Sequence, residues 1–319
     1  MAASATVVVG ATVTSVVLMT SASVGMATRS KPSPHRRDAG SLRAWYEPRR
    51  EAYPWRHQPP DPYAVFVSEV MLQQTQAPRV VPIFTSFLER FPTVAHLAAA
   101  PRDHVLRAWA GLGYHRRAVA VHEAARVMRD HHGGRVPADP DALRTLPGVG
   151  PYTASAVASI AFGLPVAAVD TNVRRITARY LRGAEPDEVA PATLAADAQS
   201  WLDASRPGDW NQALMDLGRV VCRPTPRCQD CPLIVGCRFA AAGRLGRPSV
   251  RRQPPFEGSR RQVRGRVVAA LRESDPATTA GLSRATGFPA ERIAEAVDGL
   301  VRDGVLEQAQ RGRVRFAEG

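Results

Sequence analysis

The sequence contains almost no lysine. Lys31 is the only lysine among 319 residues, and the other 41 of its 42 basic residues are arginine. A lysine amine is the usual side chain that forms a Schiff base with a carbonyl or a sugar. Because the body of the chain has no such amine, a reaction that depends on a lysine nucleophile is excluded there.

The N-terminal residues lack charge, and the first charged side chain is Arg29. A secretory signal places basic residues ahead of its apolar core, and none is present here. Polar residues and glycine also interrupt the apolar run, which argues against a membrane span. We therefore interpret residues 1–38 as an extension that is disordered or wrongly included in the sequence, with Met26 as the candidate true start. We expect a cytoplasmic, nucleoid-associated monomer with no membrane partner, and a signal anchor is the competing interpretation.

The formal net charge is +13 and the sequence pI is about 10.7. Such an excess of positive charge favours a polyanionic partner such as nucleic acid. A genome rich in GC codons, which uses arginine wherever a cation is needed, explains the same number. Charge alone therefore leaves both interpretations open.

Cysteine is also scarce, but all four cysteines fall within sixteen residues, with the spacing C-x5-C-x2-C-x5-C: Cys222, Cys228, Cys231 and Cys237. Zinc sites made of four cysteines usually consist of two separated C-x2-C pairs. One tight central pair with two outlying cysteines is better suited to a 4Fe–4S cluster. We therefore predict a 4Fe–4S cluster, with zinc as the alternative and a disulfide as the least favoured arrangement.

Apolar residues recur at helical spacing as far as about residue 220, and no segment alternates with period two. The pattern predicts an all-α body over residues 39–240, with the cysteine loop at 222–237. An arginine- and proline-rich stretch follows, which we interpret as a basic linker over 241–262. Residues 263–319 resemble a winged-helix module, with helices at 263–273, 278–285 and 289–303 and a hairpin around Val305–Phe316.

Three short motifs carry the chemistry. Leu146–Gly150 lies between two predicted helices, where Gly148 and Gly150 leave backbone N–H groups free to bind a phosphate. Glu69 lies among apolar residues, which favours a raised pKa. Asp170 follows an apolar run. Two carboxyls in different environments suit cleavage at an anomeric carbon, with one as the acid and the other as an anion.

Seven stretches in the same order resemble the iron–sulfur helix-hairpin-helix DNA glycosylases, and among them the MutY-type adenine glycosylases. They are Pro54–Arg56, Ser68–Gln76, Gly111–Tyr114, Leu146–Gly150, Val169–Val173, Asn211–Gly218 and the cysteine loop. The resemblance covers about residues 41 to 240. It implies a six-helix barrel lobe, a cluster lobe that includes the N-terminal helix, and duplex DNA bound between them.

The resemblance also implies roles for individual residues. Glu69 would protonate adenine, and Asp170, oriented by Asn172, would stabilise or trap the sugar cation. Tyr152 occupies the position at which lyase relatives carry a catalytic lysine, so excision is expected to stop at an abasic site. The implied DNA and base contacts are Trp55 and Arg56 in the adenine pocket, Leu72, Gln74 and Tyr114 as the wedge, Gln73 and Thr75 beside it, and Gly148 and Gly150 in the hairpin.

The sequence departs from the family pattern in two places. The first cysteine gap has five residues where the family usually has six. Residues 261–319 are too short for the Nudix-like domain that family members use to recognise 8-oxoguanine. We expect a monofunctional glycosylase that removes adenine opposite 8-oxoguanine or guanine. The alternatives are a thymine-mismatch glycosylase, an endonuclease III-like damage glycosylase, and a non-catalytic iron–sulfur DNA-binding regulator.

Overall fold

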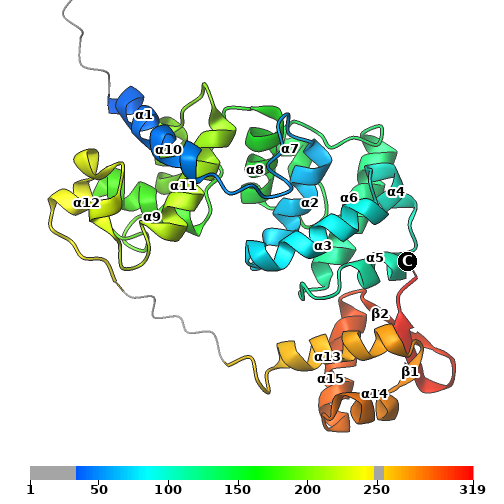
Figure 1. Cartoon of the computed structure of the whole chain (residues 1–319). Helices are drawn as coiled ribbons and strands as arrows, with labels where there is room; N and C mark the ends of the chain where they lie inside the picture. The colour runs from blue at the N-terminus through cyan, green and yellow to red at the C-terminus, as the bar shows by residue number, and fades with distance from the viewer. Residues whose placement is uncertain (1–33, 248–254, 319) are drawn as a thin grey trace, which may run out of the picture.

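The computed structural model describes residues 34–247 and 255–318, and these residues form a predominantly helical protein (Figure 1). The motifs above therefore fall within the described residues, while residues 1–33 and residues 248–254 of the predicted linker lie outside them. The predicted extension over residues 1–38 was too long, because residues 34–38 belong to the first helix. The predicted all-α body is confirmed.

Helices α2 to α8 form one lobe around a single apolar core, which we call the barrel lobe. Their bounds are α2 Pro62–Leu72, α3 Ala77–Arg90, α4 Val94–Ala99, α5 Arg102–Ala108, α6 Arg116–His131, α7 Pro140–Arg144 and α8 Pro151–Phe162. Helix α2 runs through the centre of this lobe, and nine of its eleven residues are buried. A catalytic side chain on α2 is therefore held by packing on all sides.

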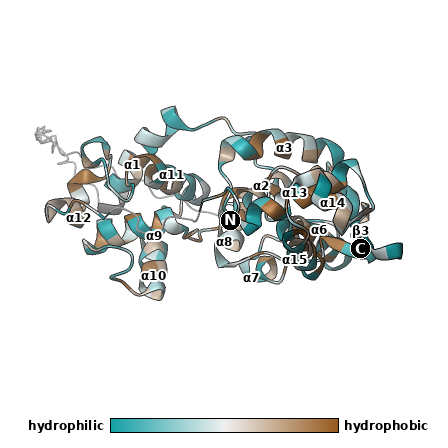
Figure 2. Ribbon diagram, turned by 90° about the horizontal axis from the view of Figure 1, so that it is seen from below, coloured by the Kyte–Doolittle hydropathy of each residue, from teal (hydrophilic) through white to brown (hydrophobic). Residues whose placement is uncertain are grey.

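A second apolar core lies in the cluster lobe, where the N-terminal helix packs against helices from the later part of the chain. The elements are α1 Pro34–Tyr46, the short 3₁₀ turn η1 Glu47–Arg49, α9 Thr171–Thr177, the π-helical turn η2 Ala178–Arg182, α10 Pro191–Trp201, α11 Pro207–Val220 and α12 Arg238–Ala241, with 3₁₀ turns η3 Cys228–Asp230 and η4 Ile234–Gly236 in the cysteine loop. Figure 2 shows this lobe at one end of the molecule, and α2, α3, α6 and α7 of the barrel lobe towards the other. The expected two-lobed arrangement, with the N-terminal helix in the cluster lobe, is confirmed.

The C-terminal residues form a winged-helix module, as predicted. Its elements are α13 Arg260–Glu273, β1 Ala277–Thr278, α14 Thr279–Thr286, α15 Ala290–Arg302, β2 Leu306–Ala309, the 3₁₀ turn η5 Gln310–Gly312 and β3 Arg313–Phe316. The strands pair antiparallel in the order β1-β3-β2, with Leu306 opposite Phe316. Ser259 caps α13 through its side chain, so this helix begins three residues earlier than the sequence pattern predicts.

The winged-helix module packs directly on the barrel lobe, and its apolar core is continuous with the barrel core. Arg107 of α5 donates to Asp275 at 2.5 Å and lies 4.8 Å from the ring centre of Phe316. The backbone N–H of Arg102 donates to the carbonyl of Glu318. The winged-helix module and the barrel lobe are therefore packed against each other (Figure 1).

No helix within residues 34–247 or 255–318 has the length and apolar character that a bilayer span requires.

Candidate active site

Glu69 and Tyr152 form the centre of the candidate active site. Glu69 lies in the last turns of α2 and is only 7% exposed. The hydroxyl of Tyr152, in the first turn of α8, donates to Glu69 Oε2 at 3.1 Å. Burial raises the pKa of Glu69 to about 7, while the Tyr152 hydrogen bond and the nearby Arg56 oppose this shift. Glu69 is therefore partly protonated at neutral pH, as a general acid must be.

Tyr152 itself is a neutral phenol at this site. Burial raises its pKa well above the ordinary value, and the charges of Glu69 and Asp170 act in the same direction. Its hydroxyl also lies 3.6 Å from the sulfur of Met215. Because it is half-buried and protonated, Tyr152 serves here as a hydrogen-bond donor to the carboxyl of Glu69.

Asp170 is the N-cap of α9, and its carboxylate accepts two hydrogen bonds from the start of that helix. Oδ1 accepts from the backbone N–H of Val173 at 2.7 Å, and Oδ2 accepts from Asn172 Nδ2 at 2.9 Å. Burial raises the pKa of Asp170, and these hydrogen bonds oppose the rise. Donors directed at the carboxylate, together with the positive helix end, favour its ionised form. The two carboxyls thus differ in environment, as the sequence predicted.

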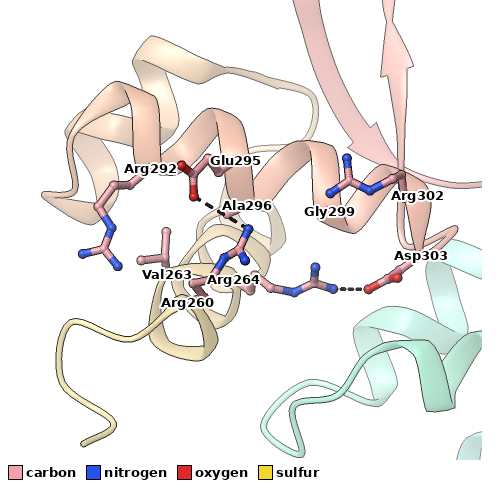
Figure 3. Close-up of a pocket in the computed structure, with 9 residues that line it drawn as sticks. All are labelled: Arg260, Val263, Arg264, Arg292, Glu295, Ala296, Gly299, Arg302 and Asp303. Atoms are coloured by element: carbon pink, nitrogen blue, oxygen red, sulfur yellow. Dashed lines mark hydrogen bonds and ion pairs between the residues drawn. The ribbon is translucent and has the colours of Figure 1, made fainter. Parts of the chain in front are cut away.

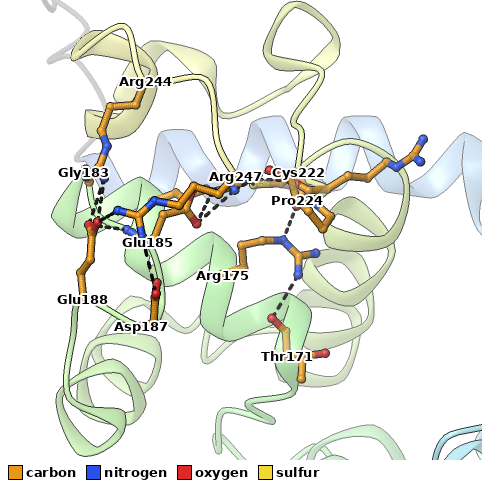
Figure 4. Close-up of polar contacts among 12 residues, drawn as sticks. Thr171, Arg175, Gly183, Glu185, Asp187, Glu188, Cys222, Pro224, Arg244 and Arg247 are labelled. Atoms are coloured by element: carbon orange, nitrogen blue, oxygen red, sulfur yellow. Dashed lines mark hydrogen bonds and ion pairs between the residues drawn. The ribbon is translucent and has the colours of Figure 1, made fainter. Parts of the chain in front are cut away.

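Arg175 supports Asp170 through Asn172, a role that no sequence pattern indicated. Its Nη2 donates to Asn172 Oδ1 at 2.8 Å and to the carbonyl of Gly218 at 2.8 Å. Its Nε donates to the carbonyl of Cys222 at 2.6 Å (Figure 4). One guanidinium therefore links the first residue of the cysteine loop to the residue that orients Asp170.

Gly218 in α11 allows α9 to approach closely. A Cβ at this position would lie 2.5 Å from the Cβ of Asn172, which is closer than two non-bonded carbon atoms approach. Residue 218 must therefore be glycine if Asn172 is to keep its position. Glycine inside a helix is less stable than alanine, so the close approach of α9 is kept here at the expense of helix stability.

We expect Gly218→Ala to displace Asn172 and to slow catalysis, although alanine favours helix formation. Overpacking at a buried contact costs about 1–3 kcal/mol, which exceeds the propensity gain of about 1 kcal/mol. The measurements are the thermal midpoint and the single-turnover rate on a mispaired duplex. Gly40→Ala in α1 is the control, because no atom lies within 4 Å of its added Cβ. Equal stability and rate in the two variants would contradict this account of Gly218.

The residues expected in the adenine pocket occupy two different environments. Trp55 is buried in the barrel core, stacked 4.8 Å from Tyr53 and edge-on to Phe84. Arg56 donates from Nη1 to Asp216 Oδ2 at 3.0 Å, and both side chains are nearly buried. Arg56 therefore acts on Glu69 through its charge, and Asp216, which received no role from the sequence, holds it in place.

The expected wedge residues lie on two loops with unusual backbone angles. Gln74 has φ 58° and is exposed, and Tyr114 has φ 47° and is 41% exposed. Leu72 ends α2 and is half-buried against the barrel core. Left-handed backbone in a residue other than glycine is a strained conformation that the surroundings must hold in place.

Arg117 in α6 holds both loops, and this residue too was missed in the sequence. Its Nη1 donates to the carbonyls of Val70, Met71 and Gln73, and its Nη2 donates to Thr75 Oγ1 at 3.0 Å and to the carbonyl of Gly113 at 3.3 Å. The guanidinium also lies 5.3 Å from the ring centre of Tyr114. A single buried cation therefore fixes the α2–α3 loop and the loop before α6 relative to each other.

The predicted hairpin is formed by α7, residues 145–150 and α8. Gly148 has φ 78°, and a Cβ there would lie 2.7 Å from the Cβ of Ala120 in α6. Gly150 is the N-cap of α8 and has open space where its Cβ would be. The side chain of Gln73 donates to the carbonyl of Gly148 and to Thr153 Oγ1, both at 3.3 Å. The hairpin is thereby tied to the loop that carries Gln74.

The cysteine loop brings four free thiols to a common cavity. Cys222, Cys228, Cys231 and Cys237 line it together with Arg179, Ile234, Phe239 and neighbouring residues. Burial is the main cause that raises the pKa of Cys231 to about 12, and the other three cysteines act in the same direction. Within the described ranges, no three His, Cys, Asp or Glu side chains lie close enough to hold a single metal ion, so the four thiols surround the cavity and do not meet at one point. Four thiols around one shared space are a donor set that fits an iron–sulfur cluster.

Buried Arg179 supports the short gap between the first two cysteines. It forms an ion pair with Glu185 at 2.8 Å, and both side chains are almost fully buried. It also donates to the carbonyls of Arg223 at 2.6 Å and Pro224 at 2.8 Å. The five-residue gap is therefore compensated by hydrogen bonds to its backbone.

The chain after α12 packs back on this loop. Gly246 has φ 78°, and a Cβ there would lie 2.4 Å from the carbonyl oxygen of Pro224. Arg244 and Arg247 form ion pairs with Glu188, as Figure 4 shows. The first residues of the predicted basic linker thus bind the cluster lobe, while residues 248–254 lie outside the described residues.

Comparison with known proteins places this site in a known superfamily. Residues 67–196 match the family described as "HhH-GPD superfamily base excision DNA repair protein". The chain is 42% identical over 279 residues to the adenine DNA glycosylase of Mycolicibacterium smegmatis, covering 86% of this chain and 94% of that protein. It is 41% identical over 240 residues to the human adenine DNA glycosylase, covering 69% of this chain and 44% of that protein.

Solved structures agree on the fold. A thermostable thymine-DNA glycosylase superposes with a TM-score of 0.61 at 29% identity, covering 66% of this chain and 97% of its own. A non-covalent endonuclease III–DNA complex gives a TM-score of 0.54 at 24% identity, with 66% and 97% covered. The fold agrees with the sequence matches, and the chain belongs to the MutY-type adenine DNA glycosylases of the helix-hairpin-helix superfamily.

Proposed function

We propose that this protein hydrolyses the N-glycosidic bond of adenine mispaired with 8-oxoguanine or guanine in duplex DNA, acting as a monomer. The proposal is carried by the buried Glu69, whose pKa is raised to about 7 by burial. Its carboxyl accepts a hydrogen bond from Tyr152, and the charge of Asp170 contributes to the raised pKa. An enzyme that acts on a base must first rotate that base out of the duplex. The family relationship supports adenine as the base that enters this site.

The reaction uses the two carboxyls in different protonation states. Glu69 in its acid form gives its proton to the departing adenine, and the Tyr152 hydroxyl orients the Glu69 carboxyl. Asp170, ionised by the donors at the start of α9, stabilises the positive charge that develops on the sugar. Water then completes the hydrolysis. Arg56, held by Asp216, limits the rise in the pKa of Glu69 by its positive charge.

We further propose that the reaction ends at an abasic site. Lys31 is the only lysine in the sequence, and a phenol occupies position 152 beside Glu69. A phenol forms no Schiff base with the sugar, so the strand is not cut through a lysine adduct. In the test, product DNA breaks only after alkaline treatment, and borohydride traps no covalent adduct.

We propose a 4Fe–4S cluster on the four cysteines as a structural group. Such a cluster, when bound, joins the cysteine loop into one rigid unit, and Arg175 and Arg179 hold the backbone of that loop. Elemental analysis tests the assignment. Equal amounts of iron and acid-labile sulfide support it, and zinc without sulfide contradicts it.

Thymine opposite guanine is the second candidate substrate, because the thymine-DNA glycosylase has a similar fold at 29% identity. The decisive experiment measures base release from duplexes that carry adenine, thymine or thymine glycol opposite guanine and 8-oxoguanine. We expect release of adenine opposite either partner. Release of thymine alone would replace adenine by the second candidate, and release of thymine glycol alone would favour a pyrimidine-damage enzyme.

The pH dependence of excision tests the role of Glu69 as the acid. Since the acid must be protonated, the single-turnover rate at saturating enzyme should fall about tenfold per pH unit above a pH of about 7. A rate that stays constant from pH 7 to 9 would exclude Glu69 as the proton donor.

Stability should show the matching effect. The pKa of Glu69 is higher in the folded than in the unfolded protein, so its contribution to stability is complete below pH 4.5 and is lost as the pH rises through about 7. Glu69→Gln is therefore expected to raise the thermal midpoint at pH 8 and to have little effect at pH 5.

A further inference from the structure

A basic pocket lies in the winged-helix module between α13 and α15 (Figure 3). Its lining residues are Arg260, Val263, Arg264, Arg292, Glu295, Ala296, Gly299, Arg302 and Asp303. Four arginines and two acids give the lining a net charge of +2. None of these residues takes part in the chemistry described above.

A glycine in the middle of α15 makes room for one of these arginines. A Cβ at Gly299 would lie 2.6 Å from Nη1 of Arg264. The guanidinium of Arg264 therefore lies directly against the helix backbone, where it forms an ion pair with Asp303. Glycine inside a helix costs about 1 kcal/mol relative to alanine. The helix thus carries a locally unfavourable residue at the point where the guanidinium meets it.

The outer face of α15 is unsuited to DNA. In winged-helix proteins the corresponding helix enters the major groove. Here the exposed residues of α15 include Glu291, Glu295 and Asp298. Glu291 and Asp298 on this exposed face repel phosphate, while Glu295 lines the pocket beside Arg260, so the usual docking mode is unfavourable. Positive charge collects instead beside this helix, in the pocket that it forms with α13.

The pocket adjoins the loop that carries Tyr114. Asp303, which pairs with Arg264, also lies 3.6 Å from Arg116 at the start of α6. Burial, with the charge of Arg264 next, lowers the pKa of His115 to about 4. Arg264 is therefore close to the residue that follows Tyr114 in the chain. A duplex held at Tyr114 has its backbone within reach of this part of the module.

We propose that the pocket between α13 and α15 binds backbone phosphates of the duplex next to the mispair, which makes the winged-helix module part of the DNA interface. This inference rests on the proposed function, because it takes duplex DNA at Tyr114 as given. Arginine guanidinium groups bind phosphate oxygens through paired N–H donors. The pocket contributes affinity that is independent of base sequence, while the active site selects the base.

Arg260 and Arg302 are the residues to change. Both are exposed, and the nearest acid to Arg260 is Glu295 at 3.8 Å. Arg264 and Arg292 are left intact, because Arg264 is paired with Asp303 and Arg292 donates to the carbonyl of Gly258. The test variant is Arg260→Ala with Arg302→Ala. The control is Arg311→Ala with Arg313→Ala, which removes the same charge from the exposed tip of the β2–β3 hairpin.

Binding is measured on full-length protein carrying Glu69→Gln, so that the duplex is not consumed. We expect the pocket variant to raise the Kd by on the order of tenfold at 0.1 M salt, and to reduce the slope of log Kd against log salt by about 2. The hairpin control should bind as the parent does. When Glu69 is intact, the pocket variant should leave the single-turnover rate at saturating enzyme unchanged.

Two results would overturn the inference: unchanged binding by the pocket variant, or loss of binding in the hairpin control alone, which would assign contact to the wing. The proposed function fails separately. Suppose that the protein with Glu69 intact released no adenine, while the pocket variant still weakened duplex binding. The phosphate site would then stand, and the assigned reaction would not. A thermal midpoint equal to that of the parent shows that the variant is folded.

Discussion

Replacing Glu69 with glutamine is expected to slow adenine release by a factor of about 10³, since general acid catalysis contributes about 10²–10⁴. Glutamine keeps the size of the side chain and an oxygen that accepts from Tyr152, but it has no proton to give to the leaving base. Asp170→Asn should slow release by about 10² or more, because the anion that stabilises the sugar cation is lost. The measurement is single-turnover base release at saturating enzyme.

The same variants separate catalysis from binding. Duplex affinity should remain within about threefold of the parent, since neither change adds bulk or alters the loops that carry Gln74 and Tyr114. Glu89→Gln on the exposed side of α3 is the matched control and should leave both quantities unchanged. A non-catalytic DNA-binding regulator predicts no base release by the parent and no effect of either active-site change. Full activity in both variants would contradict the proposed roles of Glu69 and Asp170.

Replacing Arg117 with alanine is expected to have the largest effect on the folded state. The change removes the donors that bind carbonyls at the end of α2 and in the loop before α6. Buried acceptors that lose a charged partner cost about 3–5 kcal/mol in the free energy of unfolding. In a protein of this size, whose unfolding entropy is about 0.7 kcal/mol/K, that corresponds to a fall of about 4–7 °C in the thermal midpoint. Thermal unfolding measures it.

Arg117→Lys distinguishes positioning from stability. Lysine keeps the charge, but its single ammonium group lacks the planar fork that reaches both loops. We expect partial recovery of the midpoint, with affinity for a mispaired duplex still reduced about tenfold or more. Arg129→Ala at the other end of α6 is the control, because Arg129 is exposed and pairs with the adjacent Asp130. Parent-like affinity in Arg117→Lys would show that the paired loops are not needed for binding.

The sequence was sufficient for the class of fold, while the roles of the two carboxyls came with the family resemblance and remain predictions. Helical periodicity, the hairpin glycines and the cysteine spacing are local patterns, and the structure preserves them almost residue for residue. Glu69 was recognisable because a carboxyl among apolar residues is unusual. Asp170 follows an apolar run, and its role was indicated only together with the family resemblance. The roles that depended on resemblance, such as those of Trp55 and Gln74, remain predictions for the assays above.

The arginines that organise the site were not predictable. Arg117, Arg175 and Arg179 are three of 41 arginines, so composition gives no indication of which ones are buried. Their partners are mainly backbone carbonyls, which every residue has and no sequence pattern marks. Arg117 is more than 40 residues from the α2–α3 loop, and Arg175 is 47 residues from Cys222. Only the tertiary fold brings these groups together.

The hydrogen bond between Arg175 and the carbonyl of Cys222 couples the cysteine loop to the candidate active site. The same guanidinium holds Asn172, which in turn holds Asp170. Damage that moves Cys222 therefore reaches the carboxylate through three consecutive hydrogen bonds, without any unfolding of the barrel lobe. Oxidation of the cysteine loop is therefore expected to displace Asp170 while the two loops that Arg117 holds stay in place.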